Sequence, residues 1–502
     1  MRNWLLAIAL TTSACSVAPE QSKSVAAQVV NAAPPNILIM IADDLGVETL
    51  SCYGIGQDTA ITPNLDKLCS DSIRFTSAWS QPICTPTRTG ILTGRHGFRT
   101  GSQAPGGPIV RLENIDGTPK TISAGSIIGH LVKSGAYTPP DDAPMLMRQR
   151  GERIEIKFGT GPRLDELTLA QILKSQLGYE TAAIGKWHMS DETNGGVKHP
   201  NLAGFDLYQG PMYGGVENYY SFKKWRNGEP LERATTYATT DTVNDAISWI
   251  EQRESDAPWF MWLAFNAPHD PFHKPPNELI SERSQALDPD GITPANAADY
   301  YKAMIEALDH EIGRLLSELP EETAENTVIV FLGDNGSPMG LVGAPYTDVV
   351  QSKATTFQAG LHIPLLIDAP GYAPGTRDML VHTSDLFSTI LSLTGLDAAD
   401  LEIDKILDSR TLQPIMSDAS TAFPQFNYAD LRGVTPIGQP NERVVRNARY
   451  KLYRDERTGS ELLYDLERDP TELSPINPAD ADQEQVIAIA ELRAELEALL
   501  AR

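Results

Sequence analysis

Residues 36–44 read Asn-Ile-Leu-Ile-Met-Ile-Ala-Asp-Asp, in which an uninterrupted apolar run stops at two aspartates. Further apolar runs end in the same abrupt way; they span residues 180–185, 259–267, 327–333 and 363–368. Such runs are typical of strands buried on both faces of a parallel sheet. Helix-like stretches, such as Leu167–Leu177 and Tyr300–Leu319, lie between them. This alternation predicts a layered α/β domain.

The predicted strands end in chemically useful residues. Open α/β sheets bind ligands beyond the carboxyl ends of their strands, and most of these strand ends carry a residue type that binds metals or transfers protons. Two ends contribute carboxylates and an amide, the ligands that hard cations prefer, so they predict a Ca²⁺ or Mg²⁺ site made of Asp43, Asp44, Asp334 and Asn335. The alternative is that each acid caps the turn that follows it.

Length and charge bound the protein class. A chain of 502 residues allows about three domain-sized units, or one large α/β domain with a small one. Acidic residues outnumber basic ones by 66 to 41, giving a net charge of −25. This excess argues against binding to nucleic acid or to an anionic membrane surface.

The N-terminus is typical of an exported protein. Arg2 precedes an apolar run, Trp4–Leu10, that is too short to span a bilayer and is typical of a secretory signal, so residues 1–28 are assigned to a signal peptide and tail. Small residues before Cys15 favour lipidation and membrane anchoring over plain cleavage. We expect a periplasmic or outer-membrane-anchored bacterial protein. There, Cys52 and Cys69 either form a disulfide or stay as buried thiols.

Residues 84–95 read Cys-Thr-Pro-Thr-Arg-Thr-Gly-Ile-Leu-Thr-Gly-Arg. A lone cysteine is by default an inert buried thiol, but this run resembles the type I sulfatase signature, C-x-P-x-R-x-x-x-L-T-G-R. In that family a maturation enzyme oxidises the cysteine to formylglycine, whose hydrate is the nucleophile. The resemblance implies that Cys84 is the precursor and a metal ligand, and that Arg88 stabilises the hydrate. It also implies that the predicted metal site binds Ca²⁺.

Two further elements resemble sulfatase motifs: Gly185-Lys-Trp-His188 matches G-K-W-H, and Pro268-His-Asp-Pro271 matches P-H-x-P. The resemblance implies that Lys186 and Lys353 contact the sulfate oxygens, where positive charge stabilises the transferring group. It assigns His188 as the base that releases sulfate, and His269 as the acid that protonates the leaving oxygen. A solitary histidine in either place is more often structural.

The segment around Lys353 departs from the family pattern, K-x-x-x-(Y/W)-E-G-G-x-R-x-P. Gln358, Ala359 and His362 stand where the pattern has Glu, Gly and Arg. We expect the residues that support Lys353 to differ from those of the family, and the activity to be retained. Farther on, Leu463-Tyr-Asp-Leu466 resembles the start of the family's C-terminal L-Y-D-L-x-x-D-P.

The resemblance implies an alkaline-phosphatase-like fold, with a large, mixed, mostly parallel sheet between helices. We assign residues 36–425 to the catalytic domain and 426–502 to a C-terminal subdomain with a small antiparallel sheet. There, 449–455 and 461–466 are predicted to form a hairpin, followed by an amphipathic helix. The irregular stretch 102–165 is either a lid over the site or a solvated insertion.

The predicted activity is hydrolysis of a carbohydrate or aryl sulfate to alcohol and sulfate, through a sulfated formylglycine hydrate. One alternative is a phosphonate monoester or phosphodiester hydrolase with the same motif. Another is an exported binding protein in which Cys84 stays unmodified. Residues 219–226, which are basic and aromatic, are either a surface for a sulfated sugar or an ordinary exposed face.

Overall fold

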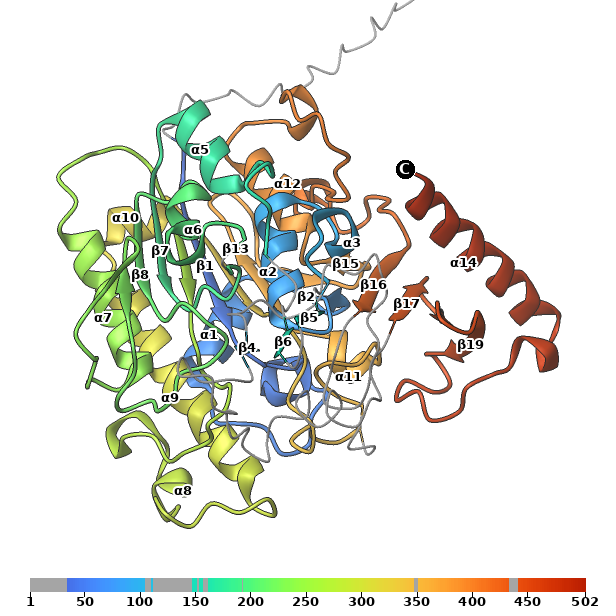
Figure 1. Cartoon of the computed structure of the whole chain (residues 1–502), viewed down its shortest axis with the longest axis horizontal. Helices are drawn as coiled ribbons and strands as arrows, with labels where there is room; N and C mark the ends of the chain where they lie inside the picture. The colour runs from blue at the N-terminus through green and yellow to red at the C-terminus, as the bar shows by residue number, and fades with distance from the viewer. Residues whose placement is uncertain are drawn as a thin grey trace, which may run out of the picture. The chain divides into compact units, whose positions relative to one another are not determined.

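A ten-stranded sheet runs through the protein in the order β10-β9-β8-β7-β11-β1-β12-β13-β2-β14. Figure 1 labels its strands β1, β2, β7, β8 and β13. The computed structural model describes residues 34–103, 110–111, 147–150, 153–156, 161–191, 193–346, 351–432 and 441–502. The strands of the large sheet are β1 (Asn36–Ala42), β2 (Ile73–Phe75), β7 (Glu180–Gly185), β8 (Leu207–Gly210), β9 (Trp225–Arg226), β10 (Glu229–Pro230), β11 (Trp259–Ala264), β12 (Thr327–Gly333), β13 (Leu365–Asp368) and β14 (Gly375–Arg377).

The centre of this sheet is parallel, as predicted. β8, β7, β11, β1 and β12 pair in parallel, whereas β13 is antiparallel to both of its neighbours, β12 and β2. The expectation of a parallel strand at 363–368 is therefore wrong in direction. The reversal brings the beginning of β13, rather than its end, to the edge where the parallel strands finish, which explains why Pro370-Gly371 after it carries no ligand type.

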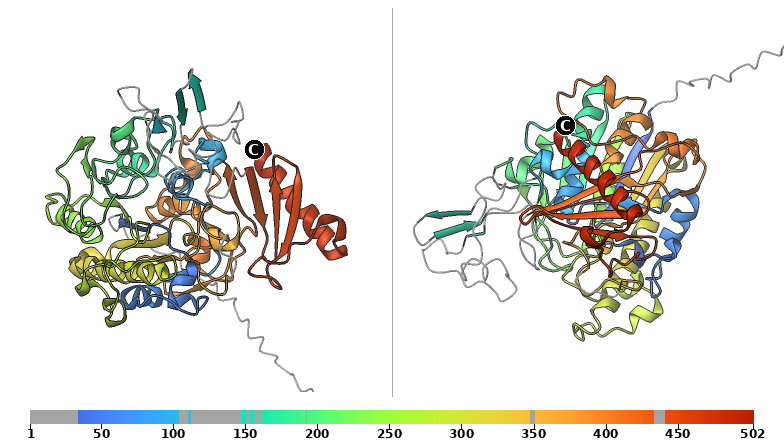
Figure 2. Two further views of the ribbon diagram at one scale, coloured as in Figure 1. Left: turned by 60° about the horizontal axis from the view of Figure 1, so that its bottom comes forward. Right: turned by 90° about the vertical axis from the view of Figure 1, so that its right-hand side faces the viewer.

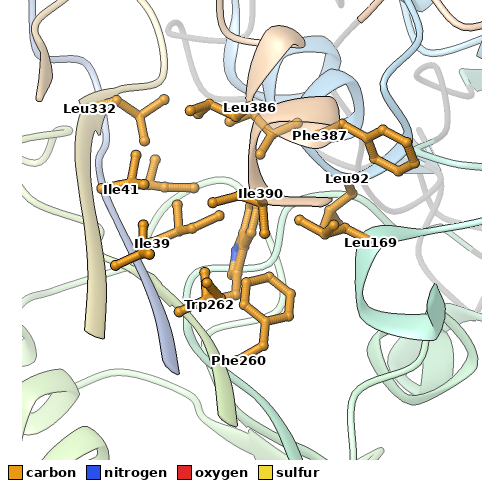
Figure 3. Packing of buried hydrophobic residues seen from close by; sticks show 14 of the residues in the cluster. Ile39, Ile41, Leu92, Leu169, Phe260, Trp262, Leu332, Leu386, Phe387 and Ile390 are labelled. Carbon is orange, nitrogen blue, oxygen red and sulfur yellow. The ribbon is translucent and has the colours of Figure 1, made fainter. Parts of the chain in front are cut away.

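Helices cover both faces of the sheet. Alternate residues of β1 point to opposite sides, so both faces are apolar and both are buried. Ile37, Ile39 and Ile41 face one buried cluster, which Figure 3 shows packing against the helices that carry Leu92, Leu169 and Ile390. Its helices are α2 (Cys84–Thr93), α5 (Leu169–Leu177), α12 (Asp385–Leu393) and α13 (Gln413–Ser417). The opposite cluster is covered by α1 (Pro63–Asp71), α7 (Ala238–Glu251) and α9 (Ala297–Glu318).

The C-terminal part is a four-stranded antiparallel sheet with a helix on one face (Figure 2). Its elements are β16 (Asn427–Arg432), β17 (Asn441–Arg446), β18 (Tyr450–Asp455), β19 (Ser460–Asp465) and α14 (Gln483–Ala501). Ile489, Leu492 and Leu496 of α14 are buried against the sheet, so the predicted hairpin and amphipathic helix are both confirmed. Residues 34–502 form one compact unit, and the boundary at 425/426 stays a prediction.

Smaller elements complete the described fold. They are α3 (Gly97–Thr100), α6 (His199–Leu202), α8 (Glu282–Gln285), α10 (Glu321–Glu325), α11 (Gln358–Leu361), β3 (Ala78–Trp79), β15 (Val381–His382), β4 (Val110–Arg111), β5 (Met147–Arg150) and β6 (Arg153–Ile156). The last three form a small antiparallel sheet within the stretch 102–165. The choice between lid and solvated insertion rests on residues outside the described ranges, as do the predicted signal and Cys15.

Cys52 and Cys69 form a disulfide, which decides between the two alternatives for this pair. Cys84 is the free cysteine of the described residues, and it is buried. Across the same ranges, none of the helices combines the length and apolar character that crossing a bilayer requires.

Candidate active site

Four buried acidic or thiol groups meet at the carboxyl edge of the sheet. Asp43 and Asp44 follow β1, Asp334 follows β12, and Cys84 is the first residue of α2. One ligand atom from each lies within 4.8 Å of the others, and all four side chains are buried. Asp44 adopts a left-handed backbone (φ 68°), and its N–H donates to the Asp334 carboxylate at 3.0 Å. The fold thus brings the predicted ligands together.

Each carboxylate of the cluster is paired with a cation, two of them buried and the third half-buried. Arg88 lies against Asp334 through two nitrogens, at 2.9 and 2.8 Å, while Lys186 donates to Asp43. The Lys353 ammonium is 2.6 Å from the nearer Asp44 oxygen. Since an unpaired charge in a protein interior is costly, these ion pairs offset the cost of burying the carboxylates.

The amide of Asn335 completes a donor set suited to a hard cation. Its Nδ2 donates to Asp44 at 2.8 Å, while its Oδ1 is buried without a hydrogen-bond partner among the described residues. A buried acceptor of this kind normally has a partner. Three carboxylates and an orphaned amide oxygen match the ligands of Ca²⁺ or Mg²⁺, so the residues fit the predicted metal site.

Cys84 lies between the acid cluster and Lys186. Its thiol donates to the Asp43 carboxylate at 3.4 Å, and the Lys186 ammonium is 3.7 Å from the sulfur. Burial raises the pKa of this thiol, so the unmodified sulfur stays neutral. Because the thiolate is the reactive form, the cysteine as encoded is a weak nucleophile.

His188 and His269, predicted as base and acid, have opposite pKa shifts. Burial, assisted by Lys186, lowers the pKa of His188 well below its usual value, and its Nδ1 is buried without a partner in the described structure. Burial and Lys353 also lower the pKa of His269, but the carboxylates of Asp44 and Asp43 outweigh them, so the net shift is upward. Opposite shifts in neighbouring titratable groups suit one base and one acid.

The departures from the family pattern near Lys353 are accommodated by hydrogen bonds. The Gln358 side chain accepts from Trp79 Nε1 at 2.7 Å, and His362 Nε2 lies 2.8 Å from the Thr76 carbonyl. The Lys353 backbone N–H donates to the Ser337 carbonyl at 2.9 Å. Lys353 therefore reaches the cluster despite the substitutions.

Two residues of the basic and aromatic stretch 219–226 are buried and bonded within the protein, so they are not part of an exposed sugar-binding surface. Lys224 is buried and forms ion pairs with Asp241, at 2.6 Å, and Asp245 on α7. Tyr219 is also buried, with its hydroxyl 2.7 Å from the carbonyl oxygens of Asn266 and His269. Tyr219 therefore supports the His269 loop, a role that the sequence pattern did not indicate.

Gly214 and Gly215 are a second feature that the sequence analysis missed. A Cβ atom on Gly214 would lie 2.8 Å from His188 Nε2, whereas one on Gly215 would make ordinary contacts of 3.6 Å with the His269 ring. This dipeptide therefore runs beside both histidines and leaves room for the His188 ring. A Gly-Gly pair shortly after a strand was the signal available in the sequence.

Comparisons with known proteins agree with this site. The family model described as Sulfatase matches residues 35–124 and 134–396. The chain is 26% identical over 447 residues to the uncharacterized sulfatase YdeN of Escherichia coli (strain K12), covering 78% of this chain and 68% of that protein. It is 26% identical over 505 residues to N-acetylgalactosamine-6-sulfatase of Homo sapiens, covering 91% and 84%.

Solved structures share the fold. The crystal structure of Ps i-CgsB superposes with a TM-score of 0.68 at 22% identity, covering 92% of each chain. The structure of BT4656 in complex with its substrate D-glucosamine-2-N,6-O-disulfate gives a TM-score of 0.65 at 19% identity, covering 93% of this chain and 97% of that one.

Removal and return of a divalent cation tests the metal site without any measurement of turnover. We expect Ca²⁺ to raise the Tm of chelator-treated protein, because a ligand at about 100 times its Kd stabilises the folded state by roughly 2.7 kcal/mol. Asp334→Asn should shrink this rise, whereas Asp71→Asn, on an exposed acid of α1, should leave it unchanged. A Tm that is insensitive to saturating Ca²⁺ and Mg²⁺ would contradict the metal assignment.

Proposed function

This chain belongs to the sulfatase family and is an enzyme that hydrolyses sulfate esters, and we propose that its substrate is a sulfated saccharide and its nucleophile is formylglycine made from Cys84. The observation that carries the proposal is the position of Cys84 at the start of a fully buried helix, beside Asp43 and Lys186. Oxidation would replace a neutral thiol with an aldehyde, whose hydrate supplies hydroxyl groups for attack on sulfur.

The residues around position 84 suit the two steps of this reaction. Lys186 and Lys353 place positive charge where the sulfate oxygens would lie. His269 donates a proton to the ester oxygen as the bond from that oxygen to sulfur breaks. His188 then accepts a proton from the second hydroxyl, so that sulfate leaves and the aldehyde is restored. A Ca²⁺ or Mg²⁺ ion held by the acid cluster and Asn335 would add charge that favours an ionised attacking hydroxyl.

The saccharide assignment has support from relatives and from the site. Two similar proteins are N-acetylgalactosamine-6-sulfatases, and BT4656 was solved with a glucosamine disulfate. In this chain the half-buried rings of Tyr213 and Trp225 pack edge to face, 5.8 Å between centroids, and Tyr213 directly precedes the Gly214-Gly215 dipeptide. Aromatic rings with a polar edge provide rigid contact area for a ring-shaped ligand. This pair is the contact that we propose for a sugar ring.

The chemical state of residue 84 tests the proposed nucleophile. We expect mass spectrometry of the peptide that contains this residue, from protein made in the native host, to show an aldehyde. Cys84→Ala should abolish turnover, because no other group takes its place. A peptide that carries only the thiol, in protein that still hydrolyses an aryl sulfate, would contradict the proposal. A thiol together with no turnover would favour the binding-protein alternative.

A comparison of substrates tests the saccharide assignment. We expect kcat/KM for a sulfated mono- or oligosaccharide to exceed that for an aryl sulfate, and both to exceed that for an aryl phosphonate. Trp225→Ala should lower the ratio of saccharide to aryl sulfate kcat/KM roughly fivefold to tenfold, the size of an aromatic contact of about 1 kcal/mol. Lys223→Ala, on an exposed neighbour paired with Glu217, should leave the ratio unchanged. An unchanged ratio in Trp225→Ala would exclude the Tyr213–Trp225 pair as a contact for the saccharide.

Gly214→Ala tests the geometry of the base. The new methyl group would lie 2.8 Å from Nε2 of the buried His188 and force the ring to shift, so we expect kcat to fall by roughly 100-fold. Gly215→Ala is the matched control, since its methyl group fits without a clash, and kcat with an aryl sulfate should change far less. Equal rates in the two variants would show that His188 is not held against Gly214.

A further inference from the structure

A buried ion pair outside the acid cluster joins Lys451 of β18 to Glu472, which lies just beyond the Leu463–Leu466 motif. Both side chains are only 1% exposed. Burial of two charges carries a desolvation cost that their attraction does not reliably offset, so such a pair is weak evidence of a gain in stability. Glu472 also adopts a left-handed backbone (φ 56°), which is disfavoured for a residue with a side chain. These features call for an explanation other than stability.

The ion pair contacts the segment that carries Lys353. The Lys451 ammonium donates to the Thr356 carbonyl at 2.6 Å, and the Glu472 carboxylate accepts from the Gln358 backbone N–H. On the other side of Lys353, the Gln351 side chain donates to the Glu472 carbonyl at 3.1 Å. The two residues of the C-terminal part therefore bind residues 351–358 on both sides of the lysine.

Aromatic rings enclose the ammonium group of Lys451. Its Nζ is 5.8, 5.6 and 5.5 Å from the ring centroids of Trp79, Phe357 and Tyr464. Tyr464 belongs to the C-terminal motif, and Phe357 belongs to the Lys353 segment, so the motif and the segment meet at this charge. In such surroundings, removal of one partner leaves the other charge buried and uncompensated.

The catalytic side holds the middle of the same segment. The backbone N–H groups of Lys353 and Ala354 donate to the carbonyls of Ser337, at 2.9 Å, and Pro82, at 2.8 Å. Ala354 has a left-handed backbone (φ 65°) that turns the chain immediately after the lysine. Since Ser337 and Pro82 lie close in sequence to Asp334 and Cys84, the segment is held between the acid cluster and the C-terminal sheet.

We propose that the Lys451–Glu472 ion pair is a positioning device that fixes residues 351–358 so that the Lys353 ammonium reaches Asp44 and the sulfate group. The part that concerns sulfate rests on the proposed function, in which Lys353 contacts the substrate. The C-terminal motif thereby gains a role, since it places Tyr464 and Glu472 against the catalytic segment. Lys451 and Glu472 act only through Lys353 and do not touch the reacting atoms.

A crystal structure of Lys451→Met tests the geometry independently of turnover. This change keeps an unbranched side chain that is one atom shorter, and it leaves Glu472 without its cation. We expect residues 351–358 to shift and the Lys353 ammonium to move out of contact with Asp44. A Lys353 that stays in contact with Asp44 would overturn the proposal, whether or not the enzyme is active. Should the variant fail to crystallise or fold, Glu472→Gln, which keeps the shape of the side chain, serves for the same measurement.

A double-mutant cycle with Lys353→Ala tests the effect on catalysis. Lys451→Met alone should lower kcat for an aryl sulfate roughly tenfold or more, measured per folded enzyme with its residue 84 oxidised. Added to Lys353→Ala, it should have no further effect, because the group it positions is already gone. Effects that multiply in the cycle would show a merely structural role and overturn the proposal.

Arg454→Met is the matched control for both measurements. It removes an ion pair of the same strand, with Glu461 at 2.9 Å, whose members do not contact residues 351–358. We expect kcat and the position of Lys353 to be unchanged. A fall in kcat equal to that of Lys451→Met would show that loss of any charge on β18 lowers kcat, and would overturn the proposal. Absence of sulfate release by the wild type would contradict the proposed function alone, since the crystal structure still decides the positioning role.

Discussion

Mutual repulsion among three buried carboxylates governs the rest of the site. Asp43, Asp44 and Asp334 lie together at one sheet edge with almost no exposure to solvent. Like charges so placed repel one another, and burying them together is costly unless positive charge is brought in. The chain brings it from three places, since Arg88, Lys186 and Lys353 belong to a helix, a strand end and a loop. Ion pairs therefore hold segments that are hundreds of residues apart against the same three carboxylates.

Strand direction determines how these segments reach that point. The aspartates and Lys186 follow parallel strands, so their place at the carboxyl edge is set by the sheet itself. Lys353 comes before a strand, and it reaches the same edge because β13 runs the opposite way. A strand end gives a side chain little freedom, whereas a loop ahead of a strand needs support of its own. The contacts with Lys451 and Glu472 provide it.

The sequence predicted most of the fold and the residues of the candidate site, because both leave local signals. Apolar runs that end in acids mark buried strands, and motifs such as residues 84–95 have fixed spacing. It did not predict contacts that join distant positions without a local pattern. Lys224 was grouped with an exposed surface, because its pairing with Asp241 and Asp245 depends on how α7 packs. The support that Tyr219 gives to the His269 loop was missed for the same reason.

The burial of α2 sets an order of events in the biosynthesis of this protein. Every residue of that helix is buried, and Cys84 is only 2% exposed. In the folded protein this sulfur is therefore screened from a second enzyme. The proposed oxidation of residue 84 by a maturation enzyme is therefore expected to take place before α2 is fully packed. On that proposal, a chain that folds before it is oxidised would keep its thiol, and the oxidised fraction of the protein would reflect the relative rates of folding and oxidation.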